Sequence, residues 1–484
     1  MDLQDFRKTK IVATLGPASL DKVKELIIAG VNVFRLNFSH GTQDVHAANI
    51  AKIREFAKEL DTNIAILADL QGPKIRCGMV KEPGILLEVG QDFIISTEEC
   101  LGEGSRVSTI YTPLSDEVVP GNRILLDDGL LELEVKEVQG KDVHTKVIVG
   151  GKLTSRKGIN LPNVDIKAPA LTPKDTEDLR FILTQDVDFV ALSFVRKPED
   201  LDLVHQIMDE AGRHLKVISK IEKPEALVHI DAIIEKSDGL MVARGDLGVE
   251  IPAEQVPTEQ KRMIAKCNQV GKPVIVATQM LDSMIRNPRP TRAEASDVAN
   301  AVLDGASAVM LSGESASGSY PIQSVEFMAK IIKNAEQNFF TESGLKRGHL
   351  EYSINNDVEG ITYSAVNLSC MLDAKMIVCV TDSGSTVRQT ARYRPLPPIV
   401  AVSDVENPVT RQLALTWGVN VLPVEDLAHT DECFLRIENK IKEMDHLKDG
   451  DLVVITAGLP LLKKTTTNMI KVYRVDRSET NMFL

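Results

Sequence analysis

Two carboxylates and a lysine follow apolar, strand-like runs in the middle of the chain. Glu222 and Asp246 each end such a run, and Lys220 lies two residues before Glu222. If both carboxylates face one mouth, they suit a hard divalent cation such as Mg²⁺, which keeps several waters and shares its other positions with substrate oxygens. The residues alone also allow a general acid–base pair, or surface carboxylates that face lysines.

Lys220 and Glu222 would point to the same side of a strand, because side chains two residues apart share a face. A lysine beside a metal could stabilise a transferring phosphoryl group or an enolate. It could equally form a Schiff base, or serve as the charge partner of Glu222. Further positive charge is expected around the same rim from Arg35, His40, Arg76 and Arg244.

Gly245 and Asp246 are expected in a sharp turn whose backbone N–H groups could bind a carboxylate, although an ordinary glycine turn is the alternative. A second anion site is suggested by Thr381-Asp-Ser-Gly-Ser-Thr386, which follows a strand pattern and precedes a helical one. Hydroxyls and N–H groups at a helix N-terminus suit a phosphate, and the alternative is a capping turn without a ligand.

The elements that must position these residues alternate as strand and helix. The first helix is expected to be capped by Ser19 and to end at Gly30. Eight parallel strands that alternate with helices predict a closed (β/α)8 TIM barrel, whose reactive residues follow the strands, and an open doubly wound sheet is the alternative. The strands are expected at 10–15, 31–36, 64–69, 189–193, 217–221, 239–243, 273–277 and 308–311.

Two further units account for the rest of the chain. Residues 71–167 show short alternating runs separated by turn residues, with no good helix, and so predict an all-β insertion. After a polar stretch near 338–348, strand patterns at 376–380, 399–402, 420–424 and 451–455 predict a smaller α/β unit. The expected domains are 1–70 with 168–345, then 71–167, and finally 346–484.

Composition excludes several classes of protein. The 484 residues contain 56 Lys and Arg against 69 Asp and Glu, for a net charge of −13, which argues against binding nucleic acid or an anionic membrane. The six cysteines are scattered, and neither a signal-peptide core nor an apolar run of about 20 residues is present. A cytoplasmic location is therefore expected.

The motifs, in their order, resemble those of the pyruvate kinase family along nearly the whole chain. Several strings carry the resemblance: Arg35-Leu-Asn-Phe-Ser-His-Gly41, Ser219-Lys-Ile-Glu222, Met241-Val-Ala-Arg-Gly-Asp-Leu-Gly248, Ala277-Thr-Gln-Met280, Pro288-Arg-Pro-Thr-Arg-Ala-Glu294 and Ser296-Asp-Val-Ala-Asn-Ala-Val-Leu-Asp-Gly305. The resemblance implies that phosphoenolpyruvate gives its phosphoryl group to ADP, leaving an enolate that is protonated to pyruvate. It also implies that the insertion is a lid and the C-terminal α/β domain an effector domain.

The resemblance assigns roles to individual residues. Glu222 and Asp246 would hold Mg²⁺, with Mn²⁺ as a possible substitute, and a second Mg²⁺ would arrive with the nucleotide. The substrate-binding and catalytic residues would be Arg35, Lys220, Gly245, Asp246 and Thr278, with Thr278 near the face that is protonated. Nucleotide contacts are implied for Asn37, His40, Arg76 and Lys157, with Arg76 also acting in catalysis. A homotetramer is implied as well.

One departure from the family pattern concerns K⁺. Many relatives read Asp-Thr-Lys-Gly-Pro-Glu where this chain reads Asp69-Leu-Gln-Gly-Pro-Lys74, and those relatives need K⁺. The monovalent-cation pocket would be outlined by Asn37, Ser39, Asp69 and the carbonyl of Leu70. The hypothesis is that the ammonium group of Lys74 replaces the cation, so that K⁺ is not required.

A second departure concerns the effector. The resemblance implies that a phosphorylated effector binds Thr381, Ser383, Gly384, Ser385 and Thr386. Relatives activated by fructose 1,6-bisphosphate usually have a Trp and an Arg in later loops, and the stretch 458–468 has neither. A monophosphate such as AMP, ribose 5-phosphate or glucose 6-phosphate is therefore expected.

Two other functions remain in view at this point. Another barrel enzyme that handles phosphoenolpyruvate or pyruvate, such as a lyase, would use the same carboxylate pair and metal without needing a nucleotide. A non-catalytic regulatory relative is the third reading. The presence of Lys220, Glu222, Asp246 and Thr278 argues against it.

Overall fold

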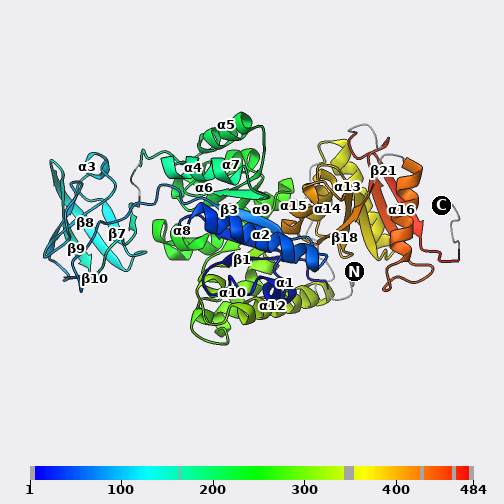
Figure 1. Cartoon of the computed structure of the whole chain (residues 1–484), viewed down its shortest axis with the longest axis horizontal. Coiled ribbons are helices and arrows are strands. Elements are labelled where there is room, and N and C mark those ends of the chain that lie inside the picture. Colours follow the sequence, from blue (N-terminus) through cyan, green and yellow to red (C-terminus); the bar gives the residue numbers. More distant parts are fainter. Residues whose placement is uncertain are drawn as a thin grey trace.

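Three bodies lie in a row in the computed structural model (Figure 1). The insertion, in cyan, stands at one end, the strand–helix barrel occupies the centre, and the yellow-to-red C-terminal unit lies at the other end. The structure describes residues 6–162, 164, 166–342, 354–425, 430–460 and 465–478. The expected domain boundary at 345/346 lies outside the described residues.

The central body is a closed barrel of eight parallel strands, which confirms the (β/α)8 fold and removes the open-sheet alternative. Its order around the ring is β1-β16-β15-β14-β13-β12-β3-β2. The expected strands are all present, with ends that differ by at most two residues. Their bounds are β1 Lys10–Leu15, β2 Val33–Asn37, β3 Ala65–Asp69, β12 Phe189–Leu192, β13 Lys216–Ile221, β14 Gly239–Ala243, β15 Val274–Ala277 and β16 Ala308–Leu311.

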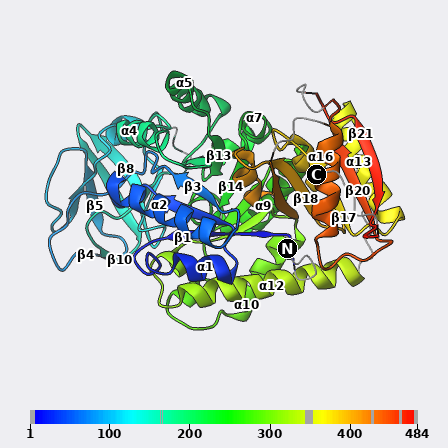
Figure 2. The ribbon, with the colours of Figure 1, turned by 45° about the vertical axis from the view of Figure 1, so that its right-hand side comes forward.

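Helices surround the barrel because their apolar faces pack against its strands (Figure 2). The first helix ends at Gly30 as expected, with the left-handed φ of 116° that glycine tolerates. The expected Ser19 cap is wrong: the cap position is Lys22, and Ser19 bonds to Gly16 instead. These helices are α1 Val23–Ala29, α2 Gln43–Glu59, α4 Pro173–Ile182, α5 Asp202–Ala211, α6 Pro224–Val228, α7 Ile230–Lys236, α8 Arg244–Glu250, α9 Val256–Val270, α10 Arg292–Leu303, α11 Gly313–Ala316 and α12 Pro321–Glu342.

The insertion is almost entirely β-structure with its own buried core. A six-stranded sheet runs β11-β7-β8-β9-β5-β6, and β10 pairs with β4. One short helix, α3 Leu114–Glu117, departs from the helix-free expectation. The strands are β4 Ile85–Leu87, β5 Asp92–Ser96, β6 Arg106–Ser108, β7 Arg123–Leu126, β8 Leu131–Gln139, β9 Asp142–Val149, β10 Gly151–Leu153 and β11 Ile159–Asn160.

The C-terminal body is a five-stranded sheet in the order β19-β18-β17-β20-β21. Four parallel strands match the expected ones, and the antiparallel edge strand β21 Met469–Arg474 was not predicted, because most of its side chains are partly exposed and its pattern is weak. The other strands are β17 Met376–Val380, β18 Ile399–Asp404, β19 Val419–Val424 and β20 Leu452–Ala457. The helices are α13 Asp357–Met371, α14 Ser385–Arg392, α15 Val409–Gln412 and α16 Thr430–Lys442, with the 3-10 turn η4 Leu413–Leu415.

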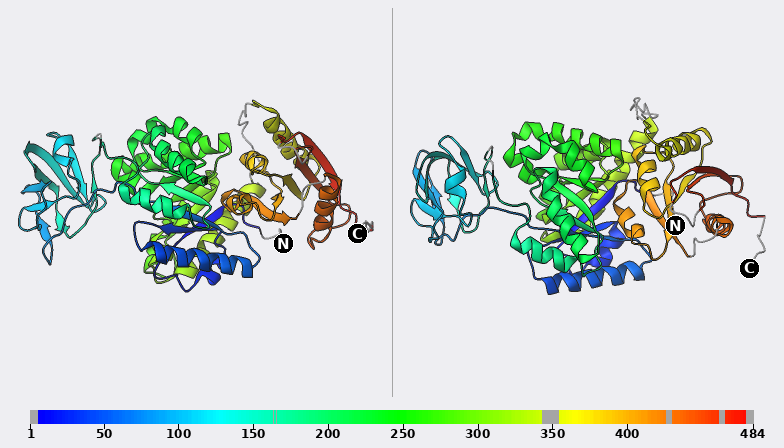
Figure 3. Two further views of the ribbon diagram at one scale, coloured as in Figure 1. Left: turned by 45° about the horizontal axis from the view of Figure 1, so that its top comes forward. Right: turned by 90° about the horizontal axis from the view of Figure 1, so that it is seen from above.

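The C-terminal body packs against the end of the barrel where the strands begin. Lys10, the first residue of β1, donates from its Nζ to the carbonyl of Val419 at 2.7 Å. Ala414 and Leu415 join the buried cluster formed by the residues inside the barrel. Figure 3 shows, in two further views of the ribbon, the C-terminal body beside the barrel. Because the strands end on the opposite side, the residues after them remain accessible for chemistry.

No helix among the described residues is long and apolar enough to cross a lipid bilayer.

Candidate active site

The ammonium group of Lys220 lies where three neighbouring strands end. Its Nζ is 3.0 Å from Glu222 Oε1 and 3.3 Å from Asp69 Oδ1, and it donates to Ser193 Oγ at 2.6 Å. These partners come from the ends of β13, β3 and β12, which are adjacent in the ring. The side chain of Lys220 is 12% exposed, so the cation is nearly buried and depends on its neighbours for charge balance.

The charges in this cluster shift one another. Burial would raise the pKa of Asp69, but Lys220 and Arg35 hold it below its ordinary value. Burial raises the pKa of Glu222, with Asp246 adding to the effect and Lys220 opposing it. Burial would lower the pKa of Lys220, but Asp69 and Glu222 raise it. Lys220 is therefore a fixed positive charge, which argues against the Schiff-base alternative, since that chemistry needs a neutral amine.

Arg35 extends the cluster across the barrel mouth. Its Nε donates to Asp69 Oδ2 at 2.6 Å, and its Nη1 donates to Thr14 Oγ1 at 3.0 Å. Asp69 thus bridges Arg35 and Lys220 with its two oxygens. The result is a pair of cations held side by side at the site, an arrangement that favours a multiply charged anion such as a phosphate.

The two expected metal ligands, Glu222 and Asp246, differ in how far they are exposed to solvent. Glu222 is buried, and its Oε2 accepts the backbone N–H of Phe194 at 2.7 Å. The side chain of Asp246, on α8, is 24% exposed, and its Oδ1 lies 3.4 Å from Lys74 Nζ. Among the residues that the structure describes, no group of three or more His, Cys, Asp or Glu is arranged to hold a metal. A cation at this carboxylate pair would take its remaining ligands from water and substrate, which fits Mg²⁺.

Thr278 and Gly245 approach each other closely. Thr278 has a left-handed φ of 71°, which is strained for a β-branched residue. Its Oγ1 accepts the N–H of Gly245 at 2.6 Å and donates to the carbonyl of Ala277 at 2.6 Å. Gly245 lies in the first turn of α8, so the sharp turn expected at Gly245–Asp246 is the start of a helix. A Cβ on Gly245 would sit 3.4 Å from Thr278, which is an ordinary van der Waals distance.

Arg244 holds this strained turn. Its guanidinium forms a two-pronged contact with Asp297, with both N–O distances at 2.7 Å. It also donates to the carbonyls of Thr278 at 2.8 Å and Ala277 at 3.2 Å. Arg244 was expected to add positive charge to the rim, but its charge is neutralised by Asp297. Strain of this kind persists only where surrounding contacts enforce it.

The residues of the expected monovalent-cation pocket surround the ends of β2 and β3. Asn37 and Asp69 are register partners on these strands. Asn37 Oδ1 accepts the N–H of Ser39 at 3.1 Å, and the carbonyl of Asn37 accepts the N–H of His40 at 3.2 Å. The carbonyl of Leu70 accepts the hydroxyl of Ser193 at 2.7 Å.

The expected nucleotide residues of the insertion bond within it. Lys157 Nζ lies 2.8 Å from Asp127 Oδ1, and Arg76 Nη1 donates to the carbonyl of Arg156 at 3.2 Å. Residues 76 and 158 form a backbone bridge, so Arg76 and Lys157 lie on adjacent connecting segments. The structure therefore groups them with each other and not with the Lys220 cluster.

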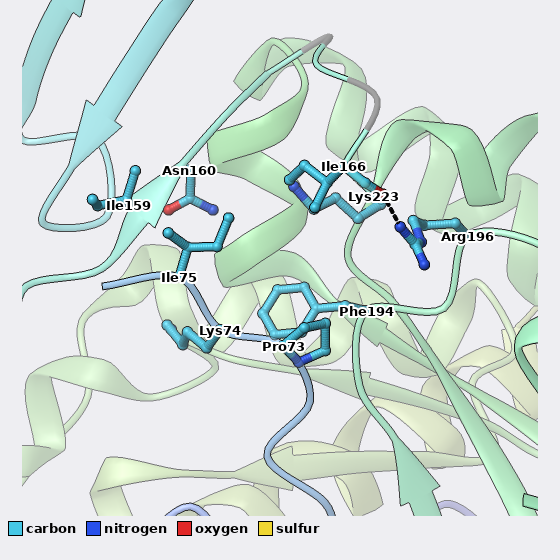
Figure 4. A pocket seen from close by; sticks show the side chains of 9 residues that line it. All are labelled: Pro73, Lys74, Ile75, Ile159, Asn160, Ile166, Phe194, Arg196 and Lys223. Atoms are coloured by element: carbon cyan, nitrogen blue, oxygen red, sulfur yellow. Dashed lines mark hydrogen bonds between the residues drawn. The ribbon is translucent and has the colours of Figure 1, made fainter. Parts of the chain in front are cut away.

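The insertion is tied to the barrel through a buried glutamate that sequence reasoning missed. Glu250 Oε1 accepts from Asn160 Nδ2 of β11 at 2.9 Å and from Lys223 Nζ at 2.6 Å. Figure 4 shows Asn160, Lys223, Lys74 and Phe194 around a small cavity at this junction. Ser193 was also missed, although it follows a strand as the other site residues do.

The loop expected to bind an effector lies on the C-terminal body, between β17 and α14. Thr381 Oγ1 accepts the N–H of Gly384 at 2.9 Å, and Ser383 Oγ accepts the N–H of Ser385 at 3.4 Å. Thr386 bonds through its hydroxyl to Thr467. Gly384 has a φ of 75° and leads into α14. The loop thus presents hydroxyls at a helix N-terminus, as expected.

A carboxylate pair, a buried lysine and an arginine lie at the mouth of a (β/α)8 barrel, which is where enzymes of this fold carry their active sites. The comparisons with known proteins name the class. The family model described as pyruvate kinase, barrel domain, matches residues 6–325, and the pyruvate kinase alpha/beta domain model matches residues 359–473.

Individual relatives and a solved structure agree with the match to the pyruvate kinase family models. The pyruvate kinase of Geobacillus stearothermophilus is 47% identical over 96% of this chain and 80% of its own length. That of Clostridium acetobutylicum is 46% identical over 97% of this chain and 100% of its own. The crystal structure of a pyruvate kinase from Cryptosporidium parvum superposes with a TM-score of 0.91 at 37% identity, covering 97% and 96% of the two chains. The chain belongs to the pyruvate kinase family, and it is a phosphotransferase.

Replacement of Asp69 tests the charge balance of the cluster. Because its folded-state pKa is lowered, Asp69 stabilises the fold at pH values above its ordinary pKa of 3.8, and this contribution is lost as the pH falls through the folded-state value. In Asp69→Asn, the free energy of unfolding should be lower at neutral pH and should fall less steeply as the pH drops below about 4. Urea unfolding at neutral pH and at pH values below about 4 measures both effects, and parallel curves would contradict the assignment.

Proposed function

We propose that this site transfers the phosphoryl group of phosphoenolpyruvate to ADP, with Lys220 stabilising the phosphoryl group in flight. The observation that carries the proposal is the position of Lys220 Nζ, which is held by Asp69, Glu222 and Ser193 at the strand ends. Little covalent chemistry falls to the protein in such a transfer. The protein accelerates the transfer by positioning the reactants and by neutralising the charge of the phosphoryl group.

Glu222 and Asp246 would hold a Mg²⁺ ion, or Mn²⁺ in its place. That ion would neutralise charge on the substrate oxygens, and a second would accompany the nucleotide. The donor set fits, because one carboxylate is buried and fixed by the N–H of Phe194, while the other is partly open to solvent. Two fixed carboxylates leave positions for substrate and water, as Mg²⁺ requires.

The remaining roles follow the reaction. Arg35, fixed by Asp69 and Thr14, would bind the phosphate, and Gly245, Asp246 and Thr278 would hold the substrate carboxylate. The bond between phosphorus and the enol oxygen breaks as a bond from phosphorus to the terminal phosphate oxygen of ADP forms. The enolate then takes a proton on carbon, delivered through water near Thr278.

The nucleotide would lie between barrel and insertion. Asn37 and His40 would meet it from the barrel, and Arg76 and Lys157 from the insertion. Because the latter two bond within the insertion, a movement of that body toward the barrel is needed to bring them to ADP. Closure would also exclude water from the transfer. The proposed domains are 1–70 with 168–345, 71–167 as this lid, and 346–484 as the effector domain, in a cytoplasmic homotetramer.

The central prediction concerns Lys220. Lys220→Met should lower kcat for ADP-dependent pyruvate release by at least about a thousandfold, because the transition state loses its fixed positive charge. Removal of divalent metal with EDTA should abolish activity, and added Mg²⁺ should restore it. A coupled lactate dehydrogenase assay measures both effects.

Lys58→Met is the matched control, since Lys58 is an exposed lysine on α2 and its loss should leave kcat unchanged. Normal turnover in Lys220→Met would overturn the mechanism. Pyruvate release that does not need ADP would indicate a lyase-type reaction instead.

Lys74 makes K⁺ dispensable in this proposal. Its ammonium group lies 3.4 Å from Asp246 Oδ1, so a fixed positive charge is already present beside the substrate position. Wild-type protein should be fully active in buffer free of K⁺ and Na⁺, and a many-fold rise on adding KCl would refute the idea. Lys74→Glu should lose activity in that buffer and regain it with KCl, whereas Lys58→Met should respond as wild type does.

The loop 381–386 would bind the phosphate of a monophosphate activator. Its hydroxyls and the N-terminus of α14 support this. Ser385→Glu should abolish activation by AMP, ribose 5-phosphate or glucose 6-phosphate, because a carboxylate would repel the phosphate. Activation of the wild type and of the variant would be compared at about 0.1 mM phosphoenolpyruvate, which lies within the usual range of KM values. An unchanged activation constant would place the effector elsewhere.

A further inference from the structure

A buried carboxylate joins the barrel to the C-terminal body. Asp188 immediately precedes β12, and its side chain has no exposed surface. Its Oδ2 accepts the N–H of Ile66 in β3 at 2.8 Å and Arg54 Nη2 of α2 at 2.6 Å. Its Oδ1 accepts Arg411 Nε of α15 at 2.9 Å. A buried carboxylate needs such partners, and one of the two cations comes from the C-terminal body.

Asp186 completes the arrangement. Its Oδ1 lies 2.7 Å from Arg411 Nη2, and its Oδ2 lies 3.0 Å from Arg54 Nε. Two carboxylates and two arginines therefore alternate in a neutral group. Each guanidinium uses two nitrogens on two different carboxylates, which fixes its orientation as well as its position.

Arg411 is itself held firmly by its own body. Asn407 Oδ1 accepts the N–H of Val409, at the start of α15, at 3.0 Å. Asn407 Nδ2 donates to the carbonyl of Asp382 at 2.7 Å. The short helix that carries Arg411 is thus anchored to the loop 381–386, and Leu415, four residues further on, is buried against the residues inside the barrel.

The strands fixed by Asp188 hold the active-site lysine at their other ends. β3 and β12 are hydrogen-bonded neighbours, with Ala191 opposite Asp69. Asp69 and Ser193 follow along these strands and contact Lys220 Nζ at 3.3 and 2.6 Å. Five residues of strand, about 16 Å, separate Asp188 from Ser193. A shift between the two strands at Asp188 would therefore alter the positions of two partners of Lys220.

We propose that Arg411 is a positioning residue for phosphoryl transfer. By anchoring Asp188, it keeps β3 and β12 in the register at which Asp69 and Ser193 hold Lys220. Arg411 touches neither substrate nor metal, and it acts through these two strands. The inference rests on the role given to Lys220 in the proposed function.

A double-mutant cycle on the full-length chain tests this, with kcat for ADP-dependent pyruvate release as the readout. Arg411→Gln should lower kcat by about tenfold in the wild-type background and by less than about twofold in the Ser193→Ala background. The effect shrinks because Ser193→Ala has already removed a contact through which Arg411 acts. If Arg411 only stabilised the fold, its substitution would lower kcat by the same factor in both backgrounds, because the effects of substitutions at distant sites are normally additive. Arg411→Lys should give an intermediate kcat.

Arg394→Gln is the matched control. This arginine also comes from the C-terminal body, but it bonds to Asn268 Oδ1 at 2.6 Å and to the carbonyl of Gly305 at 2.5 Å, outside β3 and β12. Its effect on kcat should be the same in both backgrounds, within about twofold.

Each variant is assayed below its own melting midpoint, and if Arg411→Gln does not fold, the cycle is run with Arg411→Lys. Equal effects of the Arg411 substitution in both backgrounds would overturn the inference while leaving the proposed function intact. A wild-type chain that releases no pyruvate from phosphoenolpyruvate and ADP would overturn the proposed function itself.

Discussion

The buried ammonium group of Lys220 is the constraint around which the rest of the site is arranged. A nearly buried cation must be matched by nearby anions and hydrogen-bond acceptors, and here Asp69, Glu222 and Ser193 supply them from three strand ends. Asp69 is shared with Arg35, so one carboxylate orients both cations. A closed barrel is suited to this purpose, because it brings side chains from distant parts of the chain to one rim on a rigid frame.

The same charge balance explains how an acidic protein accommodates an anionic substrate. The net charge of −13 is spread over the molecule, while the mouth gathers Arg35, Lys74 and Lys220 within a few ångströms of three carboxylates. Fixed cations in a low-dielectric pocket act far more strongly than distant surface charges, which salt screens. In the proposed function, Glu222 and Asp246 would hold a divalent metal, whose positive charge would then face the substrate.

Sequence patterns predicted the parts of the molecule that depend on local periodicity. Buried strands and the residues directly after them were found, including Lys220, Glu222 and Asp246, because a barrel places strand ends at one rim. Contacts between segments far apart in the chain were not found. Arg244 with Asp297, Lys74 with Asp246 and Asn160 with Glu250 depend on how loops and bodies meet, which no local pattern encodes. Ser193 carries no charge and so was passed over.

The burial of Leu415 against the residues inside the barrel has a consequence for synthesis of the chain. The last barrel strand ends at Leu311, yet the core inside the ring includes a side chain that is translated much later. At roughly 5–20 residues per second, the ribosome needs roughly 5–20 s more to reach it. During that interval the amino-terminal opening of the ring exposes apolar side chains to water. The core at this end of the barrel is therefore completed only after the C-terminal body has emerged from the ribosome.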